Sequence, residues 1–247
     1  MSDSAFQNSK SLPKVSVILP LHNEEGNVHS VINEIRANQP EAEIVAVDDA
    51  STDATLERLR ELENINIVCL QKNLGQSAAL YAGMHAANGK ICVLMDGDGQ
   101  IDPADISRFL EELKSCDVVC GYREKRQDEK AKLIGSKIAN AVRSTILDDG
   151  IRDTGCSLKA FPREYVRYLV PFNGLHRFLP ALFKSAGLSI REVPIHHRER
   201  LTGESKYSVS SSLARGLRGL RDTFGVRWLI ARHLRWKIDP HSDKSNF

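Results

Sequence analysis

Two aspartates and a glutamine stand close together near the middle of the chain, where they could bind a metal ion. Asp96, Asp98 and Gln100 alternate with glycines directly after the apolar run Ile91–Met95. Two carboxylates at i and i+2 suit a hard divalent cation that keeps open positions for phosphate oxygens. Such a cation would stabilise the charge that grows on a departing diphosphate. The same residues could instead cap a helix that begins near Pro103, so the motif alone leaves both interpretations open.

A second polar cluster, Asp48–Asp53, follows the apolar run Ile44–Val47. Carboxylates such as Asp48 and Asp49 at a strand end can accept hydrogen bonds from a nucleobase N–H or a ribose hydroxyl. Helix capping is the alternative, although it would need only one of these residues. The chain has neither G-x-G-x-x-G after its first apolar run nor G-x-x-x-x-G-K-[ST], which argues against nicotinamide or flavin dehydrogenases and P-loop nucleotidases.

The elements that position these clusters alternate between predicted strands and helices. The strands are short apolar runs at Val15–Leu19, Ile44–Val47, Ile65–Leu70, Ile91–Met95 and Val118–Gly121. Helical spacing of apolar residues separates them, which predicts a buried parallel sheet with helices on both faces. Ligands of such sheets bind outside the carboxyl ends of the strands. Four polar clusters are therefore expected on one rim: Pro20–Glu24, Asp48–Asp53, Lys72–Gly75 and Asp96–Gln100.

The second half of the chain is less regular. Residues 129–147 are predicted helical, and strands are expected at Leu158–Phe161 and Ile190–Ile195. A helix is expected at Phe178–Ala186. A polar loop, Arg198–Tyr207, precedes a last helix whose apolar face is formed by Val209, Leu213, Leu217, Leu220 and Phe224.

Length and composition indicate a globular protein with one large domain or a domain plus an appendage. The chain has 247 residues, of which 41% are hydrophobic and 27% charged. No run reaches the roughly 18 apolar residues that a transmembrane helix needs, and the polar N-terminus does not resemble a signal peptide. The five scattered cysteines lack zinc-ligand spacing, so we expect a reduced, cytosolic protein.

Positive charge gathers near the C-terminus. Residues 215–237 hold seven basic side chains and one acidic one, so this segment carries +6 while the whole chain carries +2. Such asymmetry indicates an anionic partner, either a membrane surface or nucleic acid. The segment Val226–Trp236 also contains two tryptophans, which fits an amphipathic segment at a membrane interface. The alternative is a helix that packs its apolar side on the rest of the protein, and both can hold together. Nucleic acid is disfavoured because no base-reading or stacking module is present.

Taken in order, the motifs resemble those of the family 2 glycosyltransferases with the GT-A fold. The motifs that carry this resemblance are Val15–Glu25, Val47–Asp53, Lys72–Gly75 and Met95–Gln100. Later segments resemble the dolichol-phosphate mannose synthase and undecaprenyl-phosphate sugar transferase group: Gly121–Arg123, Asp153–Lys159, Gly174–Ala181 and Arg198–Tyr207. The resemblance covers about residues 15 to 225.

This resemblance implies a fold and a domain organisation. The fold class is α/β, with a GT-A, Rossmann-like, mostly parallel sheet that binds a nucleotide-sugar, helices on both faces, and C-terminal amphipathic helices. The expected parts are a flexible tail at 1–13, a catalytic domain at 14–207, membrane-interfacial helices at 208–239 and a flexible tail at 240–247. Many relatives continue with transmembrane helices, so a separate membrane protein that supplies them is an expected partner.

The resemblance also implies an activity. The protein would be a metal-dependent inverting glycosyltransferase, with Mg²⁺ or Mn²⁺, that moves a sugar from a UDP- or GDP-linked donor to a polyprenyl phosphate. It would act at the cytoplasmic face of the membrane, and the product would be β-linked. The rivals are a family 2 transferase that uses a sugar hydroxyl as acceptor, which would need a general base, and an inactive nucleotide-sugar or membrane-binding module.

Carried over residue by residue, the resemblance assigns roles to particular side chains. The catalytic group is Asp98, Asp153 and Arg123. The nucleotide-sugar contacts are Pro20, His22, Glu24, Asp48, Asp49, Asp53, Asn73, Gly75 and Asp96. The metal ligands are Asp96, Asp98 and Gln100. The acceptor and phosphate contacts are Arg123, His176, Arg177, Arg198, Arg200, Ser205 and Lys206. Two departures from the family pattern are His22, where tyrosine is frequent, and Ala50, where the family usually has glycine. The neighbouring pair His196 and His197 is interpreted as a strand end rather than as a metal site.

Overall fold

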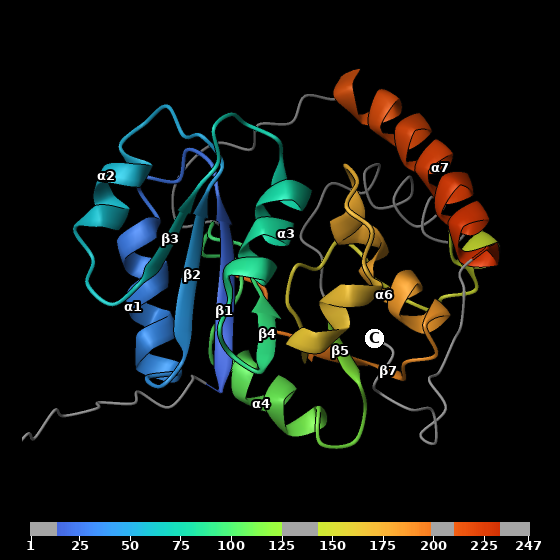
Figure 1. Ribbon diagram of the computed structural model, residues 1–247, viewed down its shortest axis with the longest axis horizontal. Helices are drawn as coiled ribbons and strands as arrows, with labels where there is room; N and C mark the ends of the chain where they lie inside the picture. The colour runs from blue at the N-terminus through green and yellow to red at the C-terminus, as the bar shows by residue number, and fades with distance from the viewer. Residues whose placement is uncertain (1–13, 125–142, 199–209, 233–247) are drawn as a thin grey trace, which may run out of the picture.

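A computed structural model of the protein describes residues 14–124, 143–198 and 210–232, with side chains in the last range from residue 219 onward. Its centre is a sheet of seven strands in the order β3-β2-β1-β4-β6-β5-β7 (Figure 1). The strands are β1 (Val15–Leu21), β2 (Glu43–Asp48), β3 (Asn66–Cys69), β4 (Ile91–Leu94), β5 (Val118–Arg123), β6 (Lys159–Pro162) and β7 (Ile190–Ile195). The predicted mostly parallel α/β sheet is thus confirmed.

One strand runs against the others. β6 pairs antiparallel with both β4 and β5, whereas β1 pairs parallel with β2 and β4, and β5 pairs parallel with β7. Lys159 at the start of β6 lies beside Leu94, the last residue of β4. The beginning of β6 therefore lies at the same rim as the ends of its parallel neighbours.

Helices cover both faces of the sheet, as the alternating pattern predicts. They are α1 (Val28–Asn38), α2 (Thr55–Arg60), α3 (Gln76–Ala86), α4 (Asp105–Glu112), the 3₁₀ helix η1 (Arg163–Tyr168), α6 (Leu175–Ser185) and α7 (Ser210–Ala231). The core on one face contains buried residues of α1, α2 and α4. The core on the other contains those of α3 and α6, together with Val226 of α7. Of the predicted helix at 129–147, residues 143–147 are described and are helical.

The helix α6 begins earlier than expected, at Leu175 instead of Phe178, and it contains Pro180. Its polar first turn, with His176 and Arg177, hides the start from a periodicity argument. The early start matters because it places these two side chains at the rim of the sheet.

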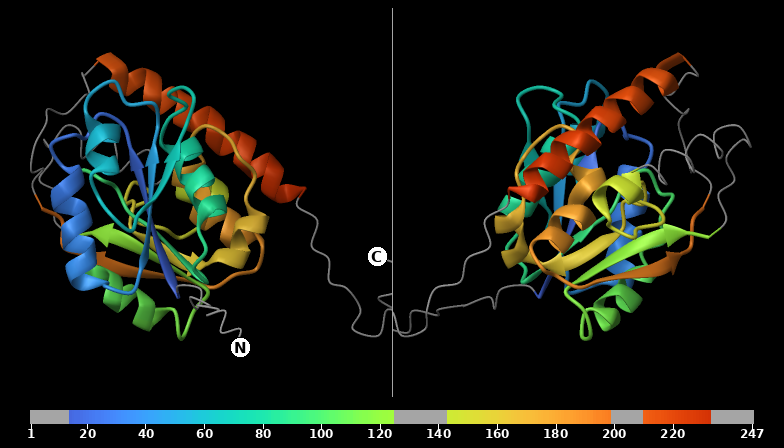
Figure 2. Two further views of the ribbon diagram at one scale, coloured as in Figure 1. Left: turned by 60° about the vertical axis from the view of Figure 1, so that its left-hand side comes forward. Right: turned by 90° about the vertical axis from the view of Figure 1, so that its right-hand side faces the viewer.

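The C-terminal helix α7 lies on the outside of the α6 layer (Figure 2). Thr223 and Val226 are buried, and Leu229 and Ile230 pack on the same core cluster as α6. Phe224 and Trp228 are 58% and 62% exposed, and Leu220 is 39% exposed. The predicted apolar face therefore does not turn inward over this part of the helix.

Two tight positions explain local sequence choices. Gly83 of α3 lies where an added Cβ would come within 2.5 Å of Ile18 Cγ2 and 2.9 Å of Val47 Cγ2. Glycine thus lets α3 approach the sheet closely. Ala50 has a φ of 53°, in the left-handed region that glycine adopts more easily. That backbone conformation explains why glycine is usual here in the family that the sequence resembles.

Candidate active site

The polar clusters predicted to converge do follow neighbouring strands of the sheet. β1 and β4 are neighbours, and the chain runs from the carboxyl end of β1 to β2 on one side but from the carboxyl end of β4 to β5 on the other side. Such a switch point creates a crevice at the strand ends, where α/β sheets bind their ligands. Two cavities open on the β4 side of this crevice, and they share Asp96 and the loop residues Gly155, Cys156 and Ser157.

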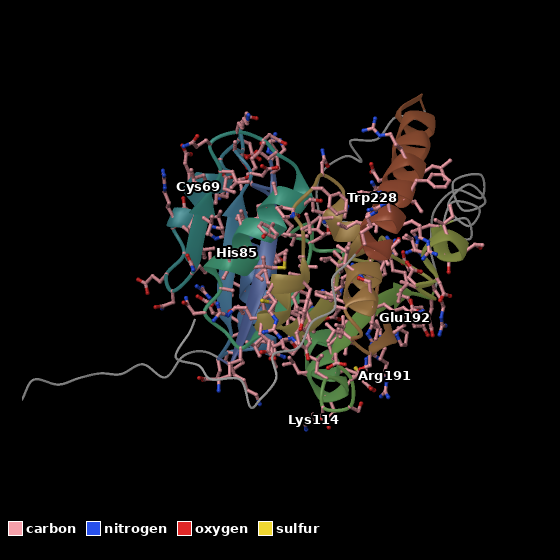
Figure 3. All side chains as sticks on the ribbon, turned by 45° about the vertical axis from the view of Figure 1, so that its right-hand side comes forward. Cys69, His85, Lys114, Arg191, Glu192 and Trp228 are labelled. Carbon is pink, nitrogen blue, oxygen red and sulfur yellow. The ribbon has the colours of Figure 1, made fainter. Side chains whose placement is uncertain are left out.

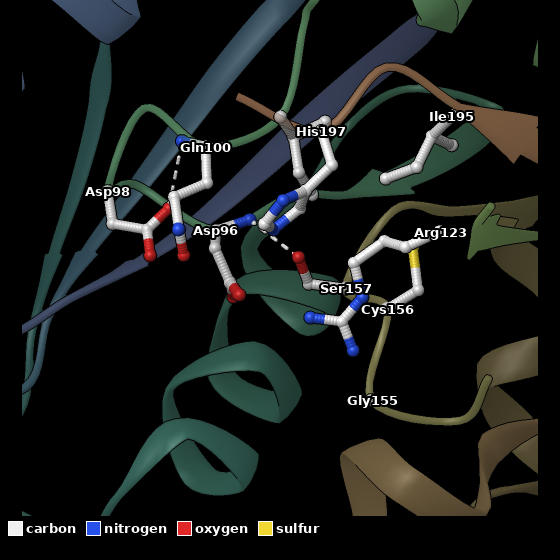
Figure 4. Close-up of a pocket in the computed structure, with 10 residues that line it drawn as sticks. Asp96, Asp98, Gln100, Arg123, Gly155, Cys156, Ser157, Ile195 and His197 are labelled. Atoms are coloured by element: carbon white, nitrogen blue, oxygen red, sulfur yellow. Dashed lines mark hydrogen bonds between the residues drawn. The ribbon is translucent and has the colours of Figure 1, made fainter. Parts of the chain in front are cut away.

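The first cavity, of about 30 Å³, contains the predicted metal motif. Asp96, Asp98, Gln100, Arg123 and His197 are among its lining residues. The carboxylates of Asp96 and Asp98 and the guanidinium of Arg123 point toward a common opening (Figure 4). The loop is shaped by a hydrogen bond of 3.1 Å from the Gln100 N–H to Asp98 Oδ1. The structure thus brings all three predicted metal ligands together with the positively charged side chain of Arg123.

Arg123 is held in place by Asp153. The guanidinium donates to both carboxylate oxygens, with Nε to Oδ2 at 2.8 Å and Nη2 to Oδ1 at 3.0 Å. Asp153 also accepts a hydrogen bond of 3.2 Å from the Gly155 N–H. A bidentate pair of this kind fixes the plane of the guanidinium. Asp153, predicted as a contact near the reacting centre, therefore orients Arg123.

Asp96 carries an unusual charge environment. Its pKa is raised from 3.8 to about 6, first by burial and then by repulsion from Asp98, although Lys159 and Arg123 oppose the rise. Gln76 Nε2 donates to Asp96 Oδ1 at 2.6 Å, and the Asp96 N–H donates to Ser157 Oγ at 3.2 Å. The two neighbouring carboxylates repel each other, and a cation between them would relieve that repulsion.

These residues fit a divalent cation that also binds phosphate oxygens of a substrate. The carboxylates of Asp96 and Asp98 and the amide oxygen of Gln100 are oxygen ligands of the kind that Mg²⁺ and Mn²⁺ take. No group of three or more histidine, cysteine, aspartate or glutamate side chains that could hold a metal occurs among the described residues. Asp96, Asp98 and Gln100 would supply part of a coordination shell, and phosphate oxygens could supply the rest.

The second cavity, of about 110 Å³, lies between the sheet, α3 and α6. Gln76, Lys159, His176 and Arg177 are among its lining residues, together with Asp96. His176 and Arg177 were predicted from the sequence, whereas Gln76 and Lys159 were not. The lining of this cavity thus contains the carboxylate of Asp96 and several hydrogen-bond donors.

His176 is a neutral donor in this cavity. Burial, followed by the nearby charges of Lys159 and Arg177, lowers its pKa to about 3. Ser77 Oγ accepts from the Gly174 N–H at 3.0 Å and lies 2.7 Å from His176 Nδ1. The Ser77 hydroxyl hydrogen is then available for Nδ1, which leaves the ring hydrogen on Nε2. His176 can therefore donate a hydrogen bond without carrying charge.

Asp49 organises the rim rather than presenting a free carboxylate. It is 2% exposed, and its oxygens accept hydrogen bonds from the Leu74 N–H at 2.8 Å and the Gly75 N–H at 2.7 Å. These bonds fix the loop that leads into α3, where Gly75 has a φ of 86°. Through this loop Asp49 also places Gln76, which bonds Asp96.

The other predicted nucleotide contacts lie at or just after the carboxyl ends of β1, β2 and β3, and they line neither cavity. His22 Nδ1 lies 2.9 Å from the Asp49 carbonyl oxygen. Asp53 accepts hydrogen bonds from the N–H and hydroxyl of Thr55, the first residue of α2, at 3.0 and 2.5 Å. The rest of this set is Pro20, Glu24, Asp48 and Asn73.

The predicted acceptor residues are only partly brought together. Arg198 pairs with Glu34 at 2.8 Å and with Asp102 at 2.5 Å, and it lines neither cavity. Arg200, Ser205 and Lys206 lie outside the described residues. His196 and His197 follow the end of β7 as expected, yet His197 lines the first cavity.

Sequence reasoning missed Lys159, Gln76 and His197. Lys159 interrupts an apolar strand, and a charged residue in such a run is a signal that could have marked it. Gln76 and His197 carry no comparable signal, because their position depends on how α3 and the end of β7 meet the loop after β4.

Comparison with known proteins adds three findings. Residues 16–169 match the family described as Glycosyl transferase family 2. The chain is 34% identical over 241 residues to a dodecaprenyl-phosphate galacturonate synthase of Rhizobium johnstonii, covering 92% of this chain and 69% of that protein. It is 32% identical over 204 residues to an undecaprenyl-phosphate 4-deoxy-4-formamido-L-arabinose transferase of Pseudomonas fluorescens, covering 78% of this chain and 60% of that protein.

Solved structures share the fold. A crystal structure of glucosyl-3-phosphoglycerate synthase from Mycobacterium tuberculosis with uridine diphosphate matches with a TM-score of 0.68 and 22% identity, covering 87% of this chain and 80% of that one. The same enzyme with Mn²⁺, UDP-glucose and glycerol 3-phosphate matches with a TM-score of 0.66. Within the part of this chain that the structure describes, no helix has the length and hydropathy needed to cross a membrane.

Proposed function

The chain belongs to glycosyl transferase family 2 and is a glycosyltransferase, and we propose that it transfers one sugar from a nucleotide-sugar to a polyprenyl phosphate at a membrane surface. The names of the two relatives support this acceptor class. The chain spans 69% and 60% of their lengths. Their activities therefore support the proposal and are not assigned to this chain directly. The observation that carries the proposal is the first cavity, where two carboxylates meet an arginine fixed by Asp153.

The donor diphosphate is assigned to the first cavity. Asp96, Asp98 and Gln100 would hold Mg²⁺ or Mn²⁺, which when bound offsets the negative charge of a leaving diphosphate. Arg123 adds a guanidinium whose position is already determined by Asp153. The nucleoside would then lie along the ends of β1 and β2, where Asp48 and the loop fixed by Asp49 offer polar groups.

The proposed chemistry needs positioning more than proton transfer. In an inverting transfer the acceptor oxygen attacks the anomeric carbon from the face opposite the leaving diphosphate. A lipid phosphate is already ionised at neutral pH, so its oxygen needs no strong general base. Catalysis would then rest on orientation and on fixed positive charge near the two anionic groups.

The acceptor phosphate requires cations on the other side of the sugar. The predicted acceptor loop supplies Arg200, Ser205 and Lys206, which stay predictions. Arg198 enters this loop with its guanidinium engaged by Glu34 and Asp102. We assign Arg198 an anchoring role at the base of the loop, because two carboxylates already offset its charge.

The membrane surface is assigned to α7. Leu220, Phe224 and Trp228 recur every four residues, so they form one exposed stripe. Helical geometry places Arg227 on one side of this stripe and Arg221 and Arg232 on the other. Arg232 also lies over the Trp228 ring at 5.4 Å from its centroid. An apolar stripe between arginines fits the interface of an anionic bilayer.

Trp228 is labelled on α7 in Figure 3, and the residue is 62% exposed. Replacing Phe224 and Trp228 by glutamate should lower binding to anionic vesicles by at least about tenfold, because a partly buried aromatic contributes over 1 kcal/mol. Val170→Glu, at an exposed valine outside α7, is the matched control and should bind normally. Equal binding of all three proteins would remove the membrane assignment. A separate membrane protein as partner stays a prediction.

A panel of nucleotide-sugars with undecaprenyl phosphate and Mg²⁺ or Mn²⁺, read by mass spectrometry, tests the function. We expect one donor to give a lipid-linked monosaccharide. Asp98→Ala should abolish the product, and Asp148→Ala, at an exposed aspartate outside both cavities, should not. Transfer to a sugar hydroxyl but not to the lipid phosphate would favour the rival family 2 activity. Full activity in excess EDTA would refute the metal role.

A further inference from the structure

Lys159 has a position that none of the predicted roles uses. Because β6 runs against its neighbours, its first residue lies at the rim where the parallel strands end, beside Leu94 and Cys120. Its side chain lines the second cavity together with His176 and Arg177. A lysine thus reaches the substrate crevice from inside the sheet.

The ammonium of Lys159 is buried and only partly satisfied. The residue is 3% exposed, and its Nζ donates to the Cys156 carbonyl oxygen. None of the ion pairs among the described residues includes Lys159. Its positive charge helps to lower the pKa of Asp96, which lines the same cavity. A buried ammonium without a paired anion destabilises the folded state, so a protein rarely keeps one without a use.

The surrounding groups are also donors. The His176 ring donates through Nε2, and Arg177 brings a guanidinium whose Nη2 pairs with Asp222 of α7 at 3.2 Å. The Arg177 Nε is buried and has no hydrogen-bond partner. Three donor side chains around a cavity of about 110 Å³ therefore face it with positive charge and N–H groups. This is the chemistry of a site for a small anion.

We propose that Lys159 binds the phosphate of the polyprenyl acceptor in the second cavity, an inference that rests on the proposed function. The metal motif and Arg123 of the first cavity account for the donor diphosphate, and the reaction brings one further anion. The two cavities are adjacent because they share Asp96 and the loop residues 155–157. A phosphate at Lys159 would thus lie beside the sugar, away from the leaving group.

The same placement gives the lipid a path. Arg177 joins the cavity to α7 through its ion pair with Asp222. The helix α7 carries the exposed stripe of Leu220, Phe224 and Trp228. An acceptor whose phosphate reaches Lys159 could extend its prenyl chain toward that stripe and the bilayer.

The test compares Lys159→Met with Lys159→Arg in the full-length protein. Methionine keeps the length without the charge, so we expect at least about a tenfold loss in kcat/KM for undecaprenyl phosphate, the size of one lost charged hydrogen bond. Lys159→Arg, which keeps the positive charge, should retain part of the kcat/KM that Lys159→Met loses. Calorimetric binding of UDP with Mn²⁺ should stay unchanged. Lys184→Met, at a half-exposed lysine outside both cavities, is the control and should keep wild-type kinetics.

Stability separates a binding role from a structural one. Replacing a buried, poorly paired cation by an apolar side chain is usually neutral or stabilising, so Lys159→Met should melt at or above the wild-type temperature. A lower melting temperature with proportionally lost activity would overturn the inference in favour of a structural role. Weaker donor binding with unchanged acceptor KM would overturn it too, since the anion would then belong to the donor. If wild type makes lipid product and Lys159→Met matches it, only this inference fails. If wild type makes none, the proposed function itself fails.

Discussion

Asp96→Asn should make the metal-free protein more stable at neutral pH while it removes activity. The pKa of Asp96 is raised from 3.8 to about 6, chiefly by burial and by Asp98. The folded state therefore disfavours the ionised carboxylate. A shift of about two units corresponds to about 3 kcal/mol, which the wild-type protein loses as the pH rises from about 4 to about 6. Asparagine has no charge to bury and can still accept the hydrogen bond from Gln76.

The expected result has a definite pH dependence. In EDTA near pH 8, Asp96→Asn should have a free energy of unfolding up to about 3 kcal/mol above wild type, and the difference should vanish below about pH 4. Asp117→Asn is the control with the opposite sign. Its pKa is lowered by hydrogen bonds from Ser189 and Tyr165, so that variant should lose stability at neutral pH and recover it in acid. Urea unfolding followed by circular dichroism measures both variants.

A divalent cation should reverse the order. Mn²⁺ that binds the ionised Asp96 and Asp98 would stabilise wild type through the binding equilibrium but would help Asp96→Asn much less. The stabilisation should fade as the pH falls through about 6, where Asp96 becomes protonated. The reasoning is refuted if Asp96→Asn is less stable than wild type near pH 8 without metal, or if the difference does not change with pH.

Three further predictions concern packing and backbone strain. Ala50→Gly should raise the free energy of unfolding by about 1 kcal/mol in urea titrations, because Ala50 has a φ of 53°. Asp149→Ala should lower it by about 3–5 kcal/mol, since the variant leaves the buried Arg143 without the carboxylate at 2.5 Å. Gly83→Ala should lower the thermal midpoint by an amount equivalent to about 1–3 kcal/mol, because the new Cβ would meet Ile18 Cγ2 at 2.5 Å; a gain in stability would contradict this.

The parallel part of the sheet could be predicted because local patterns determine it. Apolar runs separated by helical periodicity allow few topologies, and β1, β2, β3 and β4 follow them. The antiparallel insertion of β6 could not be predicted, since a run of four residues such as Lys159–Pro162 carries no information about its partners. Its direction depends on tertiary contacts with β4 and β5.

The same distinction applies to the candidate site. Residues that follow a strand directly, such as Asp96 and Asp98, could be placed at the rim from the strand pattern alone. Residues that reach the cavity from other elements could not. His176 entered the prediction through resemblance to a family, and its place beside Asp96 depends on α6 packing on α3. For Lys159 the sequence offers a charge within an apolar run, but its place at the rim depends on the reversed direction of its strand.

A carboxylate near the rim of the sheet does not by itself identify a ligand contact, as two predicted residues illustrate. Asp49 and Asp153 have the type and location expected of substrate-binding groups, yet the first bonds the Leu74 and Gly75 amides and the second holds Arg123. Their carboxylates are occupied before any substrate arrives. Loss of either should therefore act through the groups that it positions. A fixed site has a physical advantage, because donors held in place need not reorganise as charge develops in the reaction. Asp96 and Asp98 differ from these two residues because their carboxylates repel each other, and a cation bound between them would relieve that repulsion.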